Sequence, residues 1–195
     1  RKNTAFIFSS SCTVYGQADK LPVTEDAPFK QAECPYGNTK QVNEEIIRDT
    51  CAIAPNIKAI SLRYFNPIGA HESALIGELP NGVPQNLIPY ITQTAIGLRE
   101  SLSVYGDDYP TPDGTCIRDY IHVVDLAEAH LAALEYILQG KIQGNYEVFN
   151  VGTGKGSSVL EVIKAFEKVS GQPLPYKIVG LSLIHISEPT RLLSI

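Results

Sequence analysis

The sequence AFIFSSS, residues 5–11, joins a short apolar run to three serine hydroxyls, and YGNTK, residues 36–40, follows further along the chain. A short apolar run bounded by turn residues predicts a buried strand. Hydroxyls at the end of such a strand indicate a ligand site, because open α/β sheets bind ligands at the carboxyl ends of their parallel strands. Tyr36 and Lys40 stand four positions apart, so on a helix they share one face about one turn apart.

The spacing of Tyr36 and Lys40 suggests acid–base chemistry. A tyrosine, whose unperturbed pKa is about 10, acts as a base near neutral pH only where a positive charge lowers that pKa. Lys40 is placed to supply the charge. Taken alone, the pair is better explained as an unrelated tyrosine and lysine on a surface helix. The surrounding motifs must therefore distinguish a catalytic pair from this alternative.

Strand and helix patterns alternate along the rest of the chain. We expect strands at residues 5–8, 59–65, 101–105, 147–151 and 176–179 and helices at residues 36–53 and 86–98. Asp125 is expected to cap a helix that runs to Gln139, and Ser158 with Glu161 forms a capping box for a helix that ends at Gly171. This alternation predicts an α/β fold.

The composition narrows the class of protein. With 195 residues, 44% of them hydrophobic and 19% charged, the chain resembles one ordinary globular domain. A net charge of -5 without any basic run argues against a nucleic-acid partner, and no apolar stretch approaches the roughly 18 residues that predict a membrane helix. The four cysteines contain no Cys-x-x-Cys pair, which fits a reducing cytoplasm and predicts neither a metal site nor a disulfide framework.

Five segments of the chain carry motifs that occur in the same order in a known family. They are FSSSCTVYG (8–16), PYGNTK (35–40), LRYFNPIGAH (62–71), GVPQNLIPY (82–90) and DGTCIRDYIHVVDLA (113–127). Together they resemble the UDP-glucose 4-epimerase family of extended short-chain dehydrogenases/reductases. The resemblance runs from about residue 3 to residue 180 and leaves the final segment uncovered.

This resemblance implies an α/β fold, a Rossmann-type doubly wound parallel sheet whose N-terminal strands are missing, with a smaller α/β substrate domain. The expected parts are the C-terminal half of the NAD-binding Rossmann domain (1–66), a UDP-sugar region (67–122), a helix and strand that return to the Rossmann domain (123–152), and a truncated substrate domain (153–180). The glycine-rich loop that binds the NAD pyrophosphate in such folds is not in this sequence, so NAD is implied by resemblance alone. The glycine-rich segment 152–156 lacks nucleotide-binding spacing, and the resemblance makes it a strand-to-helix turn.

The implied activity is the interconversion of UDP-glucose and UDP-galactose through a 4-keto intermediate, with tightly held NAD. Ser11 and Tyr36 would bracket the sugar 4-hydroxyl, and Tyr36 as phenolate would take its proton while a hydride passes from C4 to NAD. Lys40 would lower the pKa of Tyr36 and hold the nicotinamide ribose. Phe65 would lie near the nicotinamide, which makes Ser11, Tyr36, Lys40 and Phe65 the expected NAD contacts.

The remaining implied contacts are with the UDP part of the substrate. They are Asn66, Asn86 and Arg118 for the diphosphate and Ser103, Val104 and Tyr105 for the uridine. A guanidinium suits phosphate because its hydrogen bonds are charge-assisted. Taken singly, Arg118 could instead pair with Asp113 or Asp119, Asn66 could be a turn residue, and Tyr105 could be a core aromatic. The joint pattern favours the substrate contacts.

Two other kinds of relative are the alternatives, a nucleotide-sugar 4,6-dehydratase or other NDP-sugar-modifying enzyme, and a non-catalytic nucleotide-binding protein. The dehydratases place Asp-Glu directly after the strand hydroxyl, where this chain has Cys12 and Thr13. Cys12 is expected to be a buried, unreactive thiol. A non-catalytic relative would be expected to lose Tyr36 or Lys40, and both are present. The epimerase activity is therefore favoured.

The two ends bear on what the chain does by itself. It begins at Arg1 without a methionine, and we expect residues upstream to be missing. Residues 181–191, LSLIHISEPTR, match the translation of a transposase adapter, so we expect 181–195 to be a non-native tail; a genuine amphipathic strand at 181–186 is the alternative. We expect the chain alone to be inactive, and the complete protein to be a cytoplasmic homodimer without a metal ion.

Overall fold

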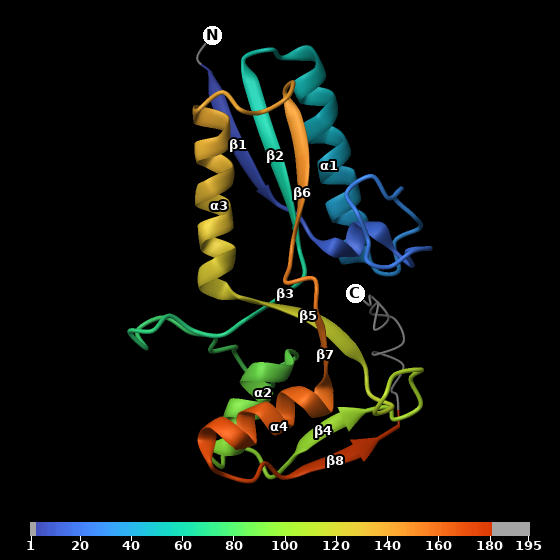
Figure 1. Ribbon diagram of the computed structural model, residues 1–195, viewed down its shortest axis with the longest axis vertical. Helices are drawn as coiled ribbons and strands as arrows, with labels where there is room; N and C mark the ends of the chain where they lie inside the picture. Colours follow the sequence, from blue (N-terminus) through green and yellow to red (C-terminus); the bar gives the residue numbers. More distant parts are fainter. Residues whose placement is uncertain (1–2, 181–195) are drawn as a thin grey trace.

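The computed structural model describes residues 3–180, and the tail at 181–195 lies outside the described residues. Its upper part in Figure 1 is a parallel sheet in the order β1–β2–β6, formed by β1 (Thr4–Ser9), β2 (Ile57–Tyr64) and β6 (Tyr146–Val151). Helix α1 (Pro35–Ile53) covers one face and helix α3 (Val123–Leu138) covers the other. Helices on both faces of a parallel sheet make this part a doubly wound α/β layer, as the sequence predicts.

Strand β2 shows why both faces of the sheet need a cover. Residues 59–63 at its centre are buried, and successive side chains along a strand point to opposite faces. Ile60 and Leu62 pack against α3, whereas Arg63 bonds to Glu44 of α1 on the other face. Truncating a fully buried isoleucine such as Ile60 to alanine costs about 2–5 kcal/mol of unfolding free energy, so this packing fixes α3 on the sheet.

The helix boundaries test the capping signals in the sequence. Helix α4 (Val159–Ser170) has the capping box predicted from Ser158, and it ends at Gly171 in the left-handed conformation that glycine favours. The cap predicted for α3 is wrong, because the helix begins after His122, whose Nδ1 accepts a hydrogen bond from Val124 N at 3.2 Å. Asp125 lies in the first turn instead, where its charge suits the positive end of the helix.

Two smaller sheets form the lower part of the molecule in Figure 1. One has the order β3–β5–β7, from β3 (Asn66–Ile68), β5 (Ile117–His122) and β7 (Gly156–Ser158), and the other pairs β4 (Leu102–Tyr105) with β8 (Tyr176–Val179). Helix α2 (Leu87–Ala95) and α4 share one cluster with the second sheet, made of Ile91, Leu102, Val104, Ile163 and Leu174. The chain enters this lower part after β2 and again after β6, so the two parts are interwoven.

The strands predicted from the sequence are all present, with their ends shifted by a residue or two. Three strands, β3, β5 and β7, and the short helix η1 (Cys12–Tyr15) were not predicted. Strands β3 and β7 are too short to show a repeating pattern. Strand β5 contains Arg118 and a buried Asp119, and these charges hide its apolar alternation.

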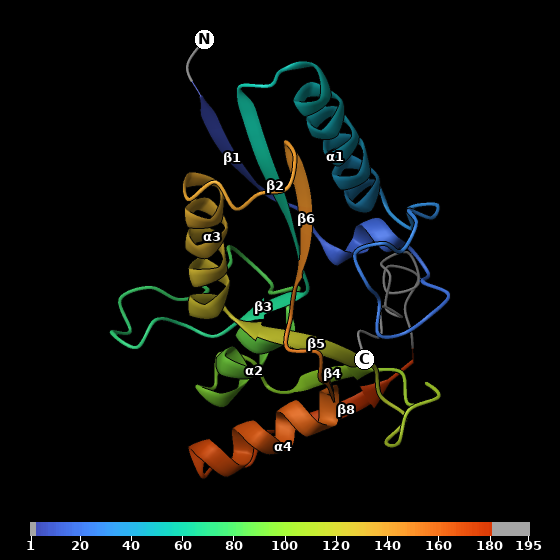
Figure 2. The ribbon, with the colours of Figure 1, turned by 45° about the horizontal axis from the view of Figure 1, so that its top comes forward.

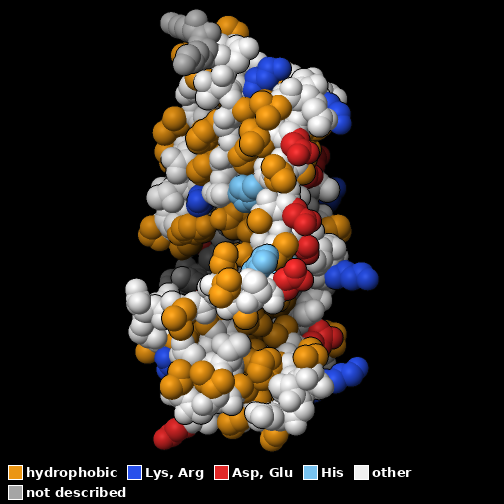
Figure 3. Space-filling view, turned by 90° about the vertical axis from the view of Figure 1, so that its left-hand side faces the viewer, with side chains coloured by type: hydrophobic (Ala, Val, Ile, Leu, Met, Phe, Trp, Pro, Cys, Tyr) orange, Lys and Arg blue, Asp and Glu red, His pale blue; other side chains and the backbone are white. Residues whose placement is uncertain are grey.

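Strand β1 lies at the edge of its sheet within the described residues, and the Phe6 side chain is partly exposed there. An edge strand presents backbone groups that another strand can pair with. Figure 3, which shows the left-hand side of Figure 1, has apolar side chains spread over its surface. Between residues 3 and 180, none of the helices is long and apolar enough to cross a bilayer.

Candidate active site

The carboxyl ends of β1, β2 and β6 meet at one edge of the upper sheet, where it borders the lower part (Figures 1 and 2). Ser11 comes just after β1, Phe65 just after β2 and Gly152 just after β6. Helix α1 starts at the same edge and brings Tyr36 and Lys40 to it. This is the position at which open α/β sheets bind their ligands.

The first turn of α1 packs closely on η1. Pro35 opens the helix, where its missing N–H costs little, and the Cys34 Sγ accepts a hydrogen bond from Gly37 N at 3.5 Å. A Cβ atom at Gly37 would lie 3.4 Å from the Thr13 carbonyl oxygen. The Thr13 hydroxyl is buried and has no hydrogen-bond partner among residues 3–180. An unused hydroxyl therefore lies beside the start of the helix.

Lys40 is tied to the end of β1. Its Nζ donates a hydrogen bond to the Ser9 carbonyl oxygen at 2.8 Å and lies 5.1 Å from the Phe8 ring centroid and 5.4 Å from that of Tyr36. A cation within about 6 Å of an aromatic ring is attracted to its face. The structure thus brings Tyr36 and Lys40 together on one face of α1, with the ammonium fixed against the strand.

Tyr36 lies beside Ser11, with 50% of its surface exposed. Partial burial raises the pKa of the Tyr36 phenol above its usual value, and a hydrogen bond from the Ser11 side chain acts in the opposite direction. Ser11 is itself buried, and its Oγ accepts a hydrogen bond from Thr13 N at 3.3 Å. The lowered Tyr36 pKa that base catalysis near neutral pH requires stays a prediction.

Arg118 on β5 carries a charge that acts on the thiols of Cys12, which is buried, and Cys116, which is partly buried. Burial raises the pKa of Cys12 to about 12 and also raises the pKa of Cys116, and the Arg118 charge acts against both shifts. Cys12 is buried, as the sequence predicts, and the raised pKa favours the protonated, less reactive thiol.

Phe65 and Asn66 lie where the chain leaves β2. Phe65 packs against the buried cluster that contains Cys12, and a Cβ atom at Gly152 would come within 2.6 Å of its ring. Asn66 begins β3, and its Nδ2 donates a hydrogen bond to the Asp119 carbonyl oxygen at 2.9 Å. Asn66 is thus part of a strand, and its amide holds β3 against β5.

Asp119 has a role that the sequence reasoning missed. It is buried, and its carboxylate accepts hydrogen bonds from Thr153 N at 2.9 Å, from Thr153 Oγ1 at 2.6 Å and from Gly154 N at 2.9 Å. The loop at 152–156 therefore binds a carboxylate of the chain itself with backbone N–H groups, as similar loops bind phosphate. The strand-to-helix turn expected here is wrong in one detail, because the loop leads into β7 before α4 begins.

Gly152 shows how closely this loop approaches the edge. A Cβ atom at Gly152 would lie 2.5 Å from Asp119 Oδ2, a distance that real side chains do not show. Glycine is therefore required where β6 passes Asp119. The signal that could have revealed this contact is the charged pair Arg118–Asp119 inside an otherwise apolar run.

The residues expected to bind UDP come from separate elements of the lower part. On β4, Val104 is 1% exposed within the core, whereas Ser103 and Tyr105 alternate to the other face. The Val104 side chain is therefore unavailable to uridine, and only its backbone can contact a ligand. Tyr105 is 39% exposed, so it is not a core aromatic. Asn86 precedes α2, and its Nδ2 donates a hydrogen bond to Glu78 Oε1 at 2.7 Å.

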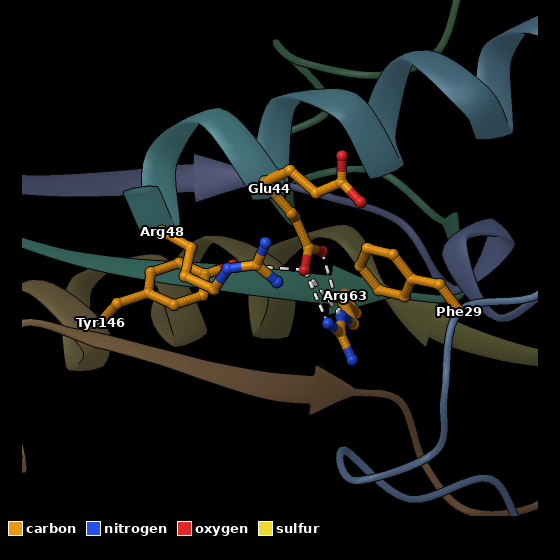
Figure 4. A pocket seen from close by; sticks show the side chains of 6 residues that line it. Phe29, Glu44, Arg48, Arg63 and Tyr146 are labelled. Atoms are coloured by element: carbon orange, nitrogen blue, oxygen red, sulfur yellow. Dashed lines mark hydrogen bonds and ion pairs between the residues drawn. The ribbon is translucent and has the colours of Figure 1, made fainter. Parts of the chain in front are cut away.

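A separate pocket of about 330 Å³ lies beside α1 (Figure 4). It is lined by Phe29, Glu44, Glu45, Arg48, Arg63 and Tyr146. None of the residues predicted for the active site is among them. In the part of the chain that the structure describes, no group of three His, Cys, Asp or Glu side chains is placed to hold a metal ion.

Comparison with known proteins places this geometry in a family. Residues 1–152 match the NAD dependent epimerase/dehydratase family. The UDP-glucose 4-epimerase of Erwinia amylovora is 56% identical over 173 residues, which is 89% of this chain and 50% of that protein. The chain spans about half the length of the curated relatives it matches.

Solved structures give the same result. The UDP-glucose-4-epimerase from Stenotrophomonas maltophila with bound NAD and formylated UDP-arabinopyranose has a TM-score of 0.86 and 49% identity, over 92% of this chain and 52% of that one. The enzyme from Bifidobacterium longum in complex with NAD+ and UDP has a TM-score of 0.84 and 51% identity, over 91% and 52%. The Rossmann-type fold class and the resemblance predicted from the sequence are confirmed. Because the matching segment 1–152 is most of the sequence, the chain belongs to the NAD dependent epimerase/dehydratase family.

Proposed function

We propose that the complete protein interconverts UDP-glucose and UDP-galactose by reversible hydride transfer at C4 of the sugar, with tightly bound NAD. The observation that carries the proposal is the arrangement at the carboxyl edge of the upper sheet. There the Lys40 ammonium lies 5.4 Å from the Tyr36 ring, and the Ser11 side chain acts against the rise in the Tyr36 pKa that burial causes. The named relatives support the proposal, and because this chain spans about half their length the activity is assigned to the complete protein.

The reaction follows from what each side chain can do. Ser11 and Tyr36 bracket the sugar 4-hydroxyl, and Tyr36 as phenolate removes its proton. Bound NAD would supply the acceptor for the C4 hydride and the donor of that hydride to the other face of the 4-keto sugar. Tyr36 then returns the proton to the C4 oxygen. Burial raises the pKa of Tyr36, and the role proposed for the Lys40 charge is to favour the phenolate against that rise.

The residues at the edge fit a dinucleotide's nicotinamide end. The buried Thr13 hydroxyl lacks a partner within the described residues, which suits a polar ligand. Phe65 offers an apolar ring beside the edge, and Lys40 offers a cation. We assign Ser11, Tyr36, Lys40 and Phe65 as the NAD contacts. The two solved relatives with bound NAD support this assignment.

The UDP part of the substrate is assigned to the lower part of the molecule. The proposed contacts are Asn66, Asn86 and Arg118 for the diphosphate and Ser103, Tyr105 and the backbone of Val104 for the uridine. Arg118 directly precedes Asp119, whose carboxylate binds the loop at the end of β6, and this supports a diphosphate close to the reacting sugar. This assignment divides the chain into an NAD-binding part at 1–66 and 123–152 and a substrate part at 67–122 and 153–180.

The complete protein is proposed to be a cytoplasmic homodimer. Val42 and Ile46, one turn apart on α1, are both exposed and form an apolar surface that a second copy would cover. The four cysteines form no Cys-x-x-Cys pair, a pattern that supports a reducing compartment. Sedimentation of the purified protein tests the dimer directly.

The activity is tested on the reading frame recovered from source DNA, which also shows whether residues 181–195 are encoded there. The purified product is expected to carry NAD and to convert UDP-galactose to UDP-glucose. The 195-residue chain expressed alone is the control and is expected to be inactive. A chimera in which residues 3–180 replace the matching segment of the Erwinia amylovora relative tests this segment in a full-length setting. A chimera or complete product that leaves both UDP-hexoses unchanged would contradict the proposal.

A further inference from the structure

A buried network of charged and polar side chains lies on the α1 face of the upper sheet (Figure 4). At its centre are Glu44 of α1, 2% exposed, and Arg63 of β2, 5% exposed. Arg63 Nη2 donates a hydrogen bond to Glu44 Oε2 at 2.6 Å, and Arg63 Nε donates one to Glu44 Oε1 at 3.0 Å. This two-pronged pairing fixes the relative orientation of the two groups as well as their distance.

Further hydrogen bonds hold both partners of the pair. Glu44 also accepts hydrogen bonds from the Ser10 hydroxyl and, at 3.2 Å, from the Tyr146 hydroxyl. Arg63 Nη1 donates a hydrogen bond to the Tyr15 hydroxyl at 2.9 Å. Well-packed apolar residues often stabilise a fold as much as a buried ion pair does, or more. Stability alone therefore does not explain a charged pair at this place.

The position of α1 depends on Glu44. The buried residues of this helix are Gly37, Glu44 and Cys51, seven positions apart, and none of them has a large apolar side chain. The pocket of about 330 Å³ lies beside the Glu44–Arg63 pair, where a packed helix face would be filled. Polar bonds, rather than apolar packing, thus set how α1 lies against the sheet.

The network is connected to the candidate active site through α1 and through the end of β1. Glu44 follows Lys40 by one turn and Tyr36 by two turns along α1, and Ser10 directly precedes Ser11. The helix is joined to the end of β1 by two polar links, one from Lys40 to a main-chain carbonyl oxygen at 2.8 Å and one from Ser10 to Glu44. Both links connect the element that carries Tyr36 with the segment that carries Ser11.

We propose that Glu44, with Ser10 and Arg63, is a positioning residue for the reaction assigned above, on which this inference rests. It holds α1 against β1 so that the Tyr36 phenol meets a sugar hydroxyl bonded by Ser11. None of the three side chains touches the reacting atoms. Because a displacement of about 1 Å can cost about 100-fold in rate, loosening the network should lower kcat while KM stays nearly constant.

The most selective variant is Ser10→Ala, which removes one link and leaves the Glu44–Arg63 pair intact. We expect kcat to fall about 10-fold at unchanged KM, since a loosened geometry slows the chemical step more than it weakens binding. Ser61→Ala is the matched control. Ser61 is as fully buried as Ser10, and its Oγ hydrogen-bonds the Tyr146 hydroxyl at 2.9 Å on the side of the network away from Ser11. Its kcat is expected to match that of the parent.

A paired replacement separates positioning from stability. Glu44→Leu alone leaves Arg63 buried without its carboxylate and is expected to lower Tm. Adding Arg63→Met replaces both charges with apolar side chains, which should return Tm towards that of the parent. Under the proposal the double variant is still about 100-fold slower in kcat, because it loses both the Ser10–Glu44 link to the end of β1 and the Glu44–Arg63 link to β2.

The outcomes divide cleanly. An inactive parent protein would overturn the proposed function, and this inference with it. An active parent in which Ser10→Ala and Ser61→Ala have the same kcat would overturn the inference alone. A double variant with both the parent's Tm and the parent's kcat would show that the network serves folding only.

Discussion

The upper sheet and the lower part of the molecule hold their polar residues in different ways. In the upper sheet, Tyr36 and Lys40 lie on a helix that buried hydrogen bonds fix to the strand before Ser11. In the lower part, Asn86 and Ser103 lie on separate elements, at the start of α2 and on β4. Groups that must meet one atom are thus preorganised on regular elements, whereas contacts along an extended ligand can be distributed over several elements.

Asp119 joins these two regions. It stands on β5 of the lower part, and its carboxylate binds the loop that leaves β6 of the upper sheet. The backbone of the same residue accepts a hydrogen bond from Asn66, where the chain leaves β2. Both passages from the upper to the lower part therefore depend on one buried residue. Variants of the complete protein can test whether rate belongs to the first region and affinity to the second.

The largest effect is expected from Tyr36→Phe. The change removes the proton acceptor but keeps the ring, so kcat should fall about 100- to 10,000-fold while the Kd for UDP-sugar stays near that of the parent. Steady-state kinetics with calorimetric titration measures both. Tyr90→Phe is a suitable control, because its ring lies over Arg99, 4.7 Å from the guanidinium carbon, away from the carboxyl edge. Near-normal turnover in Tyr36→Phe would assign the base elsewhere.

The next largest effect is expected from Lys40→Met and shows in the pH dependence. With Tyr36 as the proposed phenolate base, kcat should rise as pH passes through the Tyr36 pKa, which burial already raises. Loss of a neighbouring cation raises a pKa by about 1–3 units, so the rising limb of the kcat profile should move to higher pH by that amount. Lys40→Arg keeps the charge and should keep the limb near its original place. If the rising limb of the kcat profile stays at the same pH in Lys40→Met, the Lys40 charge does not lower the pKa of the base.

A smaller effect, on affinity, is expected from Arg118→Ala in the lower part. Loss of a charge-assisted hydrogen bond to phosphate should weaken UDP-sugar binding by about 1.5–3 kcal/mol, with kcat largely retained. Titration calorimetry with UDP measures the change. Unchanged affinity would return Arg118 to its alternative as an ion-pair partner of a neighbouring carboxylate.

The smallest effect is expected from Asp119→Asn, at the residue that joins the two regions. The variant keeps one acceptor oxygen and loses the charge that binds Thr153 and Gly154, so the unfolding free energy should fall by about 1–3 kcal/mol. Urea unfolding measures the change. Asp125→Asn, at an exposed position in the first turn of α3, is the control, and its unfolding free energy should fall by less than about 1 kcal/mol. Equal unfolding free energies of the two variants would mean that Asp119 does not hold the two regions together.

Local signals were predicted well, and contacts between distant segments were not. The Tyr36–Lys40 face and the capping box at Ser158 depend on neighbours within four positions, so the sequence displays them directly. The Asp125 cap failed because the neighbouring residue His122 supplies an equivalent acceptor three positions earlier. The bond between Asp119 and Thr153 joins residues 34 positions apart, so only the folded structure reveals it.

The same limit explains the UDP-binding residues. Ser103, Val104 and Tyr105 were assigned together by resemblance, but strand alternation sends the middle side chain into the core. The buried role of Glu44 was also missed, because its position on α1 reads as an ordinary charged helix residue until β2 brings Arg63 beside it. A single charged residue in a helix does not indicate from the sequence whether it faces solvent or a partner.

The most direct test of the division between the two regions is to measure kcat and the Kd for UDP-glucose of Tyr36→Phe and Arg118→Ala side by side in the complete protein. We expect Tyr36→Phe to lower kcat about 100-fold or more with an unchanged Kd. We expect Arg118→Ala to raise Kd with kcat largely retained. If both variants change the same constant, or if Tyr36→Phe mainly weakens binding, the division of chemistry and binding between the two regions is contradicted.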